Sequence, residues 1–339
     1  MSDRTETASR ATAREGSAAR ILPAAAESAL AEAVEALAAG RLVGMPTETV
    51  YGLAADALNP AAVARIFAAK GRPRFNPLIV HVTGRDMAAG IAEIPPAAES
   101  LIARFWPGPL TLVLDRRQDA PVAELATAGL PTIALRAPAH PVARELIARL
   151  GRPVVAPSAN RSGHVSPTTA AHVAADLGAE VAVILDAGPS AVGIESTVVR
   201  VEADGRWRPL RPGAVTEEEI AALLGPPAGD APDSPDRPLS PGRLLRHYAP
   251  TKPLRIDVTR PGRDEFYIGF GRQRADANLS ERGDLTEAAA RLFALLREAE
   301  ASTKPRIAVA PIPDEGLGRA IRDRLIRAAA GSGEKEGEG

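Results

Sequence analysis

The sequence predicts an α/β protein whose first domain holds a twisted mixed sheet and whose second, smaller domain is also α/β. Short apolar runs typical of strands alternate with amphipathic helical segments along most of the chain. Several runs are joined by loops of hairpin length, which argues against a purely parallel sheet. Residues 225–250 are rich in Pro, Gly, Asp and Ser, and this composition predicts a linker. A length of 339 residues also favours two domains over one.

Capping signals set the helices expected in the first domain. Asn59 followed by Pro60 predicts a helix start, and Thr216 with Glu219 forms the pattern of a capping box. Ser166 followed by Pro167 gives a third N-cap signal. We expect helices over Pro23–Ala39, from Asn59–Pro60 to Lys70, over Glu99–Phe105 and His140–Leu150, from Ser166 to Leu177, and from Thr216 to Leu224.

Apolar runs predict the strands, and Asp204–Gly205 predicts a hairpin turn. In the first domain we expect strands at Leu42–Met45, Leu78–Val82, Leu110–Leu114, Thr132–Leu135, Val154–Ala156, Val181–Leu185, Thr197–Val201 and Trp207–Leu210. In the second we expect strands at Leu254–Val258, Phe266–Phe270 and Ile307–Ala310, with helices over Leu285–Ala299 and Leu317–Ala330, a Rossmann-like arrangement. The predicted organisation is a disordered extension 1–20, a catalytic domain 21–224, a linker 225–250, an α/β domain 251–331 and a disordered tail 332–339.

Composition excludes several classes of function. The chain has no cysteine, which rules out disulfides, thiolate catalysis and cysteine-type zinc sites. Its five histidines are scattered without metal-ligand spacing. A net charge of -1 provides no overall basic field to attract nucleic acid. No apolar run is long enough for a membrane span, and the first twenty residues lack a signal-peptide core, so we expect a cytoplasmic protein.

Lys70 lies in an unusual cationic loop. It is the only lysine before Lys252 in a chain that otherwise uses arginine. The segment 70–77 reads Lys-Gly-Arg-Pro-Arg-Phe-Asn-Pro, with three cations in a stretch stiffened by proline. Such a loop suits phosphate, because arginine offers a fork and lysine a point charge. A solvated charged turn is the alternative interpretation.

Polar residues also follow other predicted strands. Residues 157–163 (Pro-Ser-Ala-Asn-Arg-Ser-Gly) form either an anion-binding nest or an ordinary strand-to-helix loop. His81 lies within an apolar strand, where a hydrogen-bonded core histidine is the common case, and Arg136 ends another strand, where a charge is awkward outside a site. Together these residues place polar groups at the ends of several strands, the usual ligand edge of an α/β sheet.

The ordered set of motifs resembles the YrdC-type family. The matching segments are Pro46–Leu53, Lys70–Pro73, Asn76–His81, Pro107–Thr111, Pro157–Asn160, Ser162–Gly163, Glu195–Val198 and Arg211–Gly213. The second domain, with the linker segments Ser240–Gly242 and His247–Pro250, is similar to the two-domain L-threonylcarbamoyladenylate synthases. The chain departs from the family pattern at Arg243, where Met is expected, at Ala187, where Gly is more usual, and at Ser190, where Cys is common.

This resemblance implies a reaction. L-threonine takes up CO2 or bicarbonate as a carbamate, which attacks the α-phosphate of ATP and releases pyrophosphate. The product, threonylcarbamoyl-AMP, serves to modify an adenosine beside the anticodon of certain tRNAs through a downstream threonylcarbamoyl-transferase complex. Mg²⁺ is expected to enter with ATP, held by phosphates and water. The implied fold is a twisted α/β sheet around a positively charged cavity.

The resemblance also implies roles for single residues. Lys70 and Arg72 are expected to be catalytic by neutralising charge that grows on the phosphates, while Tyr248 closes over the site with the linker. Around L-threonine and its carbamate the family pattern places Thr49, His81, Arg136, Ala156 and Ser196. Around ATP it places Lys70, Arg72, Asn76, Thr132, Ser158, Asn160, Ser166, Arg211 and Tyr248.

Two other functions compete with this one. A non-catalytic RNA-binding module could use a cationic cavity for the RNA backbone, but the net charge and an aromatic content of 3% argue against it. Carbamoyl-adenylate transfer to another acceptor is the second alternative, and replacing threonine by other amines would distinguish it.

Overall fold

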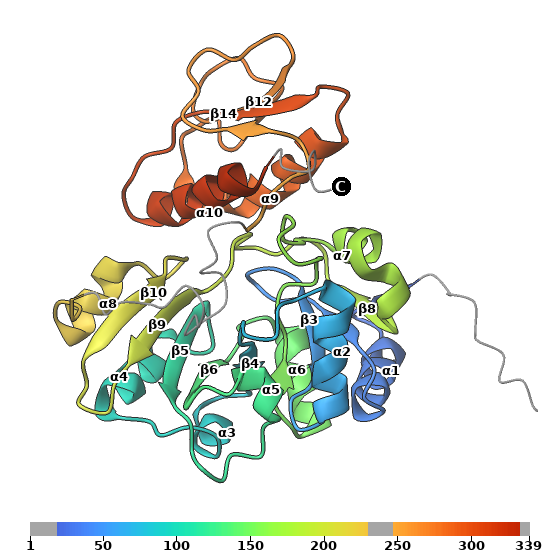
Figure 1. The fold of residues 1–339 in the computed structure, drawn as a ribbon, viewed down its shortest axis with the longest axis vertical. Helices are drawn as coiled ribbons and strands as arrows, with labels where there is room; N and C mark the ends of the chain where they lie inside the picture. The colour runs from blue at the N-terminus through green and yellow to red at the C-terminus, as the bar shows by residue number, and fades with distance from the viewer. Residues whose placement is uncertain (1–18, 230–246, 333–339) are drawn as a thin grey trace, which may run out of the picture.

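A computed structural model describes residues 19–229 and 247–332, which form two α/β domains (Figure 1). The first contains a ten-stranded sheet in the order β1-β8-β2-β3-β7-β4-β6-β5-β9-β10. Parallel pairs such as β4 with β6 alternate with antiparallel pairs such as β5 with β6, so the predicted mixed sheet is confirmed. The linker residues Ser240–Gly242 and Arg243, the tail from 333 and residues 1–18 lie outside the described ranges. Within those ranges no helix combines the length and apolarity needed to cross a bilayer.

The first domain alternates short strands with helices. Its strands are β1 Arg20–Pro23, β2 Val43–Met45, β3 Gly52–Asp56, β4 Ile79–His81, β5 Leu110–Asp115, β6 Thr132–Arg136, β7 Val154–Val155, β8 Val183–Asp186, β9 Thr197–Val201 and β10 Trp207–Arg211. Its helices are α1 Glu27–Ala38, α2 Pro60–Lys70, α3 Arg85–Ala89, α4 Pro96–Phe105, α5 Glu124–Thr127, α6 Pro141–Leu150, α7 Ala170–Leu177 and α8 Glu217–Leu224, with a 3₁₀ turn over Gly178–Glu180.

The second domain has a parallel sheet in the order β11-β14-β12-β13, as expected for a Rossmann-like unit. Its strands are β11 Leu254–Arg255, β12 Glu265–Gly269, β13 Ala277–Asn278 and β14 Arg306–Val309, and its helices are α9 Leu285–Ala301 and α10 Leu317–Gly331. Both helices lie between this sheet and the first domain (Figure 1). The second domain therefore faces the first through α9 and α10.

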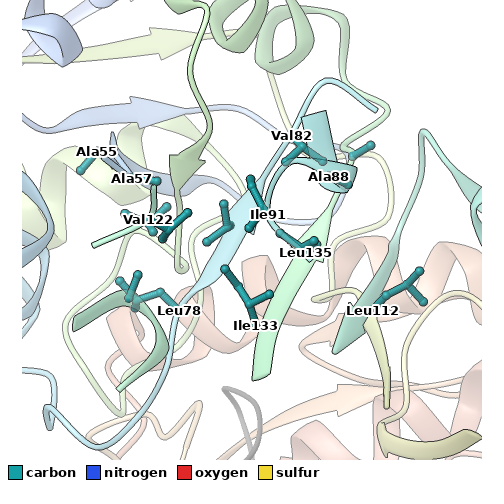
Figure 2. Packing of buried hydrophobic residues seen from close by; sticks show 14 of the residues in the cluster. Ala55, Ala57, Leu78, Val82, Ala88, Ile91, Leu112, Val122, Ile133 and Leu135 are labelled. Carbon is teal, nitrogen blue, oxygen red and sulfur yellow. The ribbon is translucent and has the colours of Figure 1, made fainter. Parts of the chain in front are cut away.

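Side chains that alternate along the strands build a core on each face of the large sheet. In β8, Ile184 belongs to one apolar cluster while Val183 and Leu185 belong to another. The larger cluster includes residues of β3, β4, β5 and β6, and Figure 2 shows Ile133 and Leu135 within it. The other cluster holds α1 and α6 against β2 and β8. This packing fixes the strand ends that carry the polar residues.

Strand register brings two predicted site residues together. His81 at the end of β4 is paired with Arg136 at the end of β6, and these strands are parallel. Carboxyl ends of parallel strands meet at one edge of a sheet, which is where α/β proteins bind ligands. Thr111 in β5 lies beside Val198 in β9. Ser196 is the residue before β9, so it lies close to the start of β5.

Local capping predictions hold where the chain supplies its own partners. Asn59 accepts hydrogen bonds from the backbone N–H groups of Ala61 and Ala62, and α2 ends at Gly71 in a left-handed conformation with φ 60°. Thr216 and Glu219 form the complete capping box of α8. The cationic loop therefore begins at a well-defined helix end.

The predicted helix start at Ser166 is wrong. Helix α7 begins at Ala170, capped by the side chain of Thr169. Residues before it are held extended, because the carbonyls of Pro167 and Thr168 accept hydrogen bonds from other loops, the first from the N–H of Tyr51. Ser166 is buried and donates its hydroxyl hydrogen to Glu195 instead of capping a helix. Tertiary contacts override the local signal.

Two strands of four or more residues were absent from the expectation. Residues Arg20–Pro23 pair with β8 as β1, so α1 begins at Glu27 rather than Pro23, and Arg20 is not part of a disordered extension. Gly52–Asp56 forms β3, between β2 and β7. Its Gly-Leu-Ala-Ala-Asp sequence lacks the β-branched residues that mark strands, so only burial in the sheet identifies it. The short β13, α3 and α5 were also not expected.

Gly193 lets the two domains approach closely. Its φ is +75°, and a Cβ atom there would lie 2.4 Å from the Cα of Ala290 and 2.5 Å from the carbonyl oxygen of Ala289, both on α9. Backbone atoms cannot yield as the tip of a side chain can. Glycine at this position therefore allows the first domain to dock on α9 without a steric clash.

We predict that Gly193→Ala destabilises the protein more than Gly151→Ala. Gly151 also has a positive φ, of +66°, but nothing lies within 4 Å of its added Cβ, so it reports the backbone cost alone, about 1 kcal/mol. Overpacking against α9 should add roughly 1–3 kcal/mol for Gly193→Ala. Urea unfolding of both variants measures the difference. Equal losses would show that this contact does not constrain the docking.

Candidate active site

Four buried cationic or titratable side chains, Lys70, Arg72, Arg211 and His247, form a cation cluster. Burial lowers the pKa of Lys70 well below its ordinary value, and the neighbouring Arg72 lowers it further. Burial and Arg211 lower the pKa of Arg72 to about 10. The pKa of His247 is lowered by burial and then by Arg72, Lys70 and Arg211, so these three cations all lie within electrostatic reach of His247.

Backbone carbonyl groups hold the first two cations. Lys70 Nζ donates to the carbonyl oxygen of Ser158 at 2.6 Å and to that of Asn160. Arg72 donates from Nε to Asn76 O at 3.1 Å and from Nη2 to Pro77 O at 2.8 Å. Within the described part of the chain neither cation makes an ion pair, so their positive charges remain available to an anion.

Local structure explains this geometry. The left-handed residue Gly71 ends α2 and turns the chain, so that Lys70 in the last helical turn and Arg72 beyond it are close neighbours. The loop 157–163 then meets the helix end, because the N–H of Ser162 donates to Lys70 O at 2.8 Å. The two segments singled out as phosphate-binding candidates thus form one structure.

A second set of residues, the Arg136 group, consists of Glu48, Thr49, His81 and Arg136. Arg136 Nη1 donates to Thr49 Oγ1 at 2.8 Å, Nη2 pairs with Glu48, and Nε donates to Gly108 O at 3.1 Å. Burial alone would raise the pKa of Glu48, but Arg136 offsets this and the pKa is lowered. This group offers a buried arginine, a hydroxyl and a carboxylate at one sheet edge, which suits a small zwitterion.

His81 is neutral in this environment. Burial and then Arg136 lower its pKa to about 3, although Glu48 acts in the opposite direction. Its Nδ1 atom is buried and has no hydrogen-bond partner among the described residues. A neutral imidazole with a free ring nitrogen is suited to hydrogen bonding with a ligand rather than to ion pairing.

Ser196 connects the cation cluster with the sheet edge. Its hydroxyl lies 2.8 Å from Thr111 Oγ1 and accepts from Arg211 Nη2 at 3.2 Å. Arg211 Nε also donates to Ser196 O at 3.1 Å. The residue expected near threonine therefore contacts a residue expected near ATP.

Many predicted site residues carry polar atoms that lack partners. Buried native polar atoms are nearly always satisfied, so a concentration of exceptions indicates a ligand site. Across residues 19–229 and 247–332 the atoms without partners are Glu48 Oε2, Asn76 Oδ1, His81 Nδ1, Thr132 Oγ1, Asn160 Oδ1, Ser190 Oγ, His247 Nδ1 and the Tyr248 hydroxyl. Five of these eight belong to the residues predicted from the sequence: Asn76, His81, Thr132, Asn160 and Tyr248.

The remaining predicted residues are placed less directly. Ala156 is buried beside Gly52, and a Cβ atom added to Gly52 would lie 3.0 Å from the Cβ of Ala156. Ser158 contributes its carbonyl oxygen to Lys70. Thr132 begins β6, and no hydrogen bond among the described residues joins its side chain to the other site residues. Tyr248 is fully buried between the domains, next to His247 with ring centroids 4.0 Å apart.

Sequence reasoning missed two charged residues of the site, Glu195 and Arg324. The segment Pro46–Gly52 suggested that its carboxylate, Glu48, could orient a small polar ligand, whereas Glu195 lies inside a noted motif without an assigned role. Arg324 comes from α10 of the second domain and reaches Glu195. Its position in an amphipathic helix gave no signal, because a buried arginine cannot be recognised from helical spacing.

Two pockets each include one residue of the cation cluster in their lining. One is lined by Lys70, Gly71, Arg161 and Asp176 among others. Another is lined by Thr197, Arg211 and Gly213 together with Gly316 and Arg319 of the second domain.

Comparison with known families accounts for both domains. Residues 35–213 match the Sua5, YciO and YrdC family described as "Telomere recombination", and residues 215–330 match the threonylcarbamoyl-AMP synthase C-terminal domain. The chain belongs to the two-domain threonylcarbamoyl-AMP synthase family. Its members include a Bacillus subtilis synthase, 42% identical over 324 residues that cover 89% of this chain and 93% of that protein. A Pyrococcus abyssi synthase is 42% identical over 315 residues, covering 86% and 91%.

A solved structure of this synthase family has the same fold. The crystal structure of P. abyssi Sua5 complexed with L-threonine matches with a TM-score of 0.80 and 38% identity, covering 89% of this chain and 94% of that one. The match covers most of both chains, so the α/β class and the second domain are features that these two proteins share.

We predict that acid destabilises the protein partly through His81. Its pKa is about 3 when folded and near 6.5 ordinarily, so between these values the unfolded chain binds a proton that the folded chain does not. The free energy of unfolding should therefore fall as pH decreases below 6.5, by up to about 1.4 kcal/mol per pH unit from this residue. Urea unfolding at several pH values should show a shallower slope for His81→Asn. An unchanged slope would contradict the assignment.

Proposed function

We propose that this chain makes threonylcarbamoyl-AMP from L-threonine, bicarbonate or CO2, and ATP, with release of pyrophosphate. The observation that carries the proposal is the buried cation cluster, joined through Ser196 and Arg211 to the sheet edge that holds Arg136. Cations with a stiff backbone suit phosphates, and an arginine beside hydroxyls suits an amino-acid carboxylate. Membership of the synthase family supports the same reaction.

The first step makes a carbamate. The unprotonated amine of threonine adds to CO2, a C–N bond forms, and the amine loses a proton to leave a carbamate anion. Arg136 holds the threonine carboxylate, for which it offers guanidinium N–H groups now donated to Thr49 and Glu48. His81 and Ser196 supply hydrogen bonds to the rest of the amino acid. Neutral His81 does not compete as a second cation.

The second step transfers the adenylyl group. A carbamate oxygen attacks the α-phosphorus of ATP in line, the bond to the bridging oxygen breaks, and pyrophosphate leaves with its electron pair. Such a reaction depends mainly on positioning and on charge stabilisation. Lys70, Arg72 and Arg211 act on the phosphates, and Asn76 and Asn160 have unpartnered amide oxygens available to donors of the nucleotide. Thr132, Ser158, Ser166 and Tyr248 complete the proposed ATP set.

Mg²⁺ is proposed to enter with ATP. Within the described residues no group of three or more His, Cys, Asp or Glu side chains is arranged to hold a metal ion. Phosphate oxygens and water would then supply most of its ligands, as is usual for this ion. The steps above use only residues of the chain.

The product is proposed to serve tRNA. Threonylcarbamoyl-AMP is an activated mixed anhydride, and a downstream threonylcarbamoyl-transferase complex would use it to modify the adenosine next to the anticodon. A cytoplasmic location fits this use. The linker, with Tyr248, is proposed to close over the site and protect the product from water.

We predict pyrophosphate release that depends on ATP, bicarbonate and L-threonine together, and its loss in Lys70→Ala and Arg72→Ala. Each variant removes a cation that stabilises the transferring phosphates, so turnover should fall by about a hundredfold or more. Circular dichroism should show both variants folded.

An amine panel tests the alternatives. Release with other amines but not with threonine would indicate another acceptor, and RNA binding without ATP consumption would indicate a binding module. Near-normal turnover in Lys70→Ala or Arg72→Ala would remove that residue from the chemistry.

A further inference from the structure

Helix α10 of the second domain delivers a fully buried arginine to the first domain. Arg324 Nε donates to Glu195 Oε2 at 3.1 Å, and Nη2 donates to the carbonyl oxygen of Glu195 at 3.3 Å. Nη1 donates to Pro212 O at 2.6 Å. Its side chain has 0% exposure, so these are not surface contacts. The Arg324 guanidinium therefore binds the chain at Glu195, just before β9, and at Pro212, just after β10.

Glu195 connects Arg324 with Ser166, one of the residues expected near ATP. Its Oε1 atom accepts the hydroxyl hydrogen of Ser166, while Oε2 is held by Arg324. The next residue, Ser196, is the anchor of Arg211. Arg324, Glu195 and Ser166 thus form a continuous chain of hydrogen bonds from the second domain into the first.

Arg324 also contacts the aromatic residue Tyr248. Its guanidinium lies 5.6 Å from the ring centroid of Tyr248, a cation–π distance. Tyr248 stacks on Phe293 of α9 with ring centroids 5.5 Å apart. Burial alone would lower the pKa of Arg324, but Tyr248, Glu195 and Asp323 outweigh it and the pKa is raised. The arginine is therefore a fixed charge between Glu195 and Tyr248.

The hydrogen-bond direction limits what Ser166 can do. A serine hydroxyl has one hydrogen to donate, and here it is committed to the Glu195 carboxylate. Ser166 can then only accept from a ligand. Phosphate oxygens are acceptors, so the matching group is a donor of the nucleoside, a ribose hydroxyl or the amino group of the base.

We propose that Arg324 is a positioning residue by which the second domain orients Ser166, through Glu195, for the nucleoside part of ATP. This inference rests on the proposed function, because it needs ATP as the ligand. It gives the second domain a task in the active site of the first. Loss of Arg324 should weaken ATP binding while leaving pyrophosphate, which has no nucleoside, bound by Lys70 and Arg72.

The test compares ATP and inorganic pyrophosphate binding by calorimetry in the full-length protein. Arg324→Met should raise the ATP dissociation constant about tenfold or more, since a charged hydrogen bond is lost, with little change for pyrophosphate. Arg324→Lys keeps the charge, so its ATP dissociation constant should lie between those of the unmodified protein and Arg324→Met. Arg319→Met is the matched control, because Arg319 lies on α10 like Arg324 and pairs with Glu218 of α8, but both of these side chains are about half exposed.

A double variant separates positioning from mere packing. Because Arg324→Met leaves the Glu195 charge buried and unpaired, Glu195→Gln with Arg324→Met should restore stability without restoring ATP affinity. The two changes should also be non-additive in ATP binding, as for residues acting in one chain. Nucleoside triphosphates lacking a ribose hydroxyl or the base amino group identify the donor: the penalty for its absence should disappear in Ser166→Ala.

Several outcomes overturn the proposal. Unchanged ATP affinity in Arg324→Met, equal losses for ATP and pyrophosphate, or additive effects with Glu195→Gln would each do so while threonine-dependent turnover of the unmodified protein still stood. Failure of the unmodified protein to bind ATP would instead remove the proposed function itself, and this inference with it.

Discussion

Burial of Lys70 and Arg72 against each other is the constraint on which the rest of the structure depends. Removing a cation from water costs several kcal/mol, and a like charge beside it adds to the cost. In the described residues only backbone carbonyl oxygens receive their N–H groups. The fold must therefore supply this energy from its apolar clusters and hold the cations in place by the end of α2 and the loop at 157–163. A bound polyanion would offset the free-energy cost of burying these two cations.

Two other buried arginines of the site differ from Lys70 and Arg72 because each has a carboxylate partner within the protein. Arg136 is paired with Glu48, and Arg324 with Glu195, so each has an internal carboxylate. The distinction suits two substrates: a triphosphate, which brings its own negative charge, and a single amino-acid carboxylate, which can share an arginine already held in position. The second pair also joins the two domains, whose close approach at Gly193 leaves α9 and α10 directly over this region.

The sequence predicted features that the chain determines locally. Asn59 and Gly71 bound α2 by their own backbone preferences, and Thr216 caps α8 as expected. Ser166 failed as a helix cap because loops distant in sequence hold it extended. The Arg324–Glu195 contact spans 129 residues and no motif marks it. Among the residues assigned through family motifs, His81 is paired with Arg136 at the sheet edge and Ser196 contacts Arg211, while the ligand roles of the whole set stay predictions.

Direct titration of Lys70 tests the central claim most sharply. The chain has lysine only at positions 70, 252, 304 and 335, so isotope-labelled lysine side chains give a simple NMR spectrum in which Lys70→Ala identifies one signal. Buried beside Arg72, the Lys70 amine should titrate below the ordinary lysine value of 10.5, and pyrophosphate should move its pKa upward. A Lys70 signal that titrates together with the other lysines, unmoved by the anion, would contradict a buried cluster of cations awaiting phosphate.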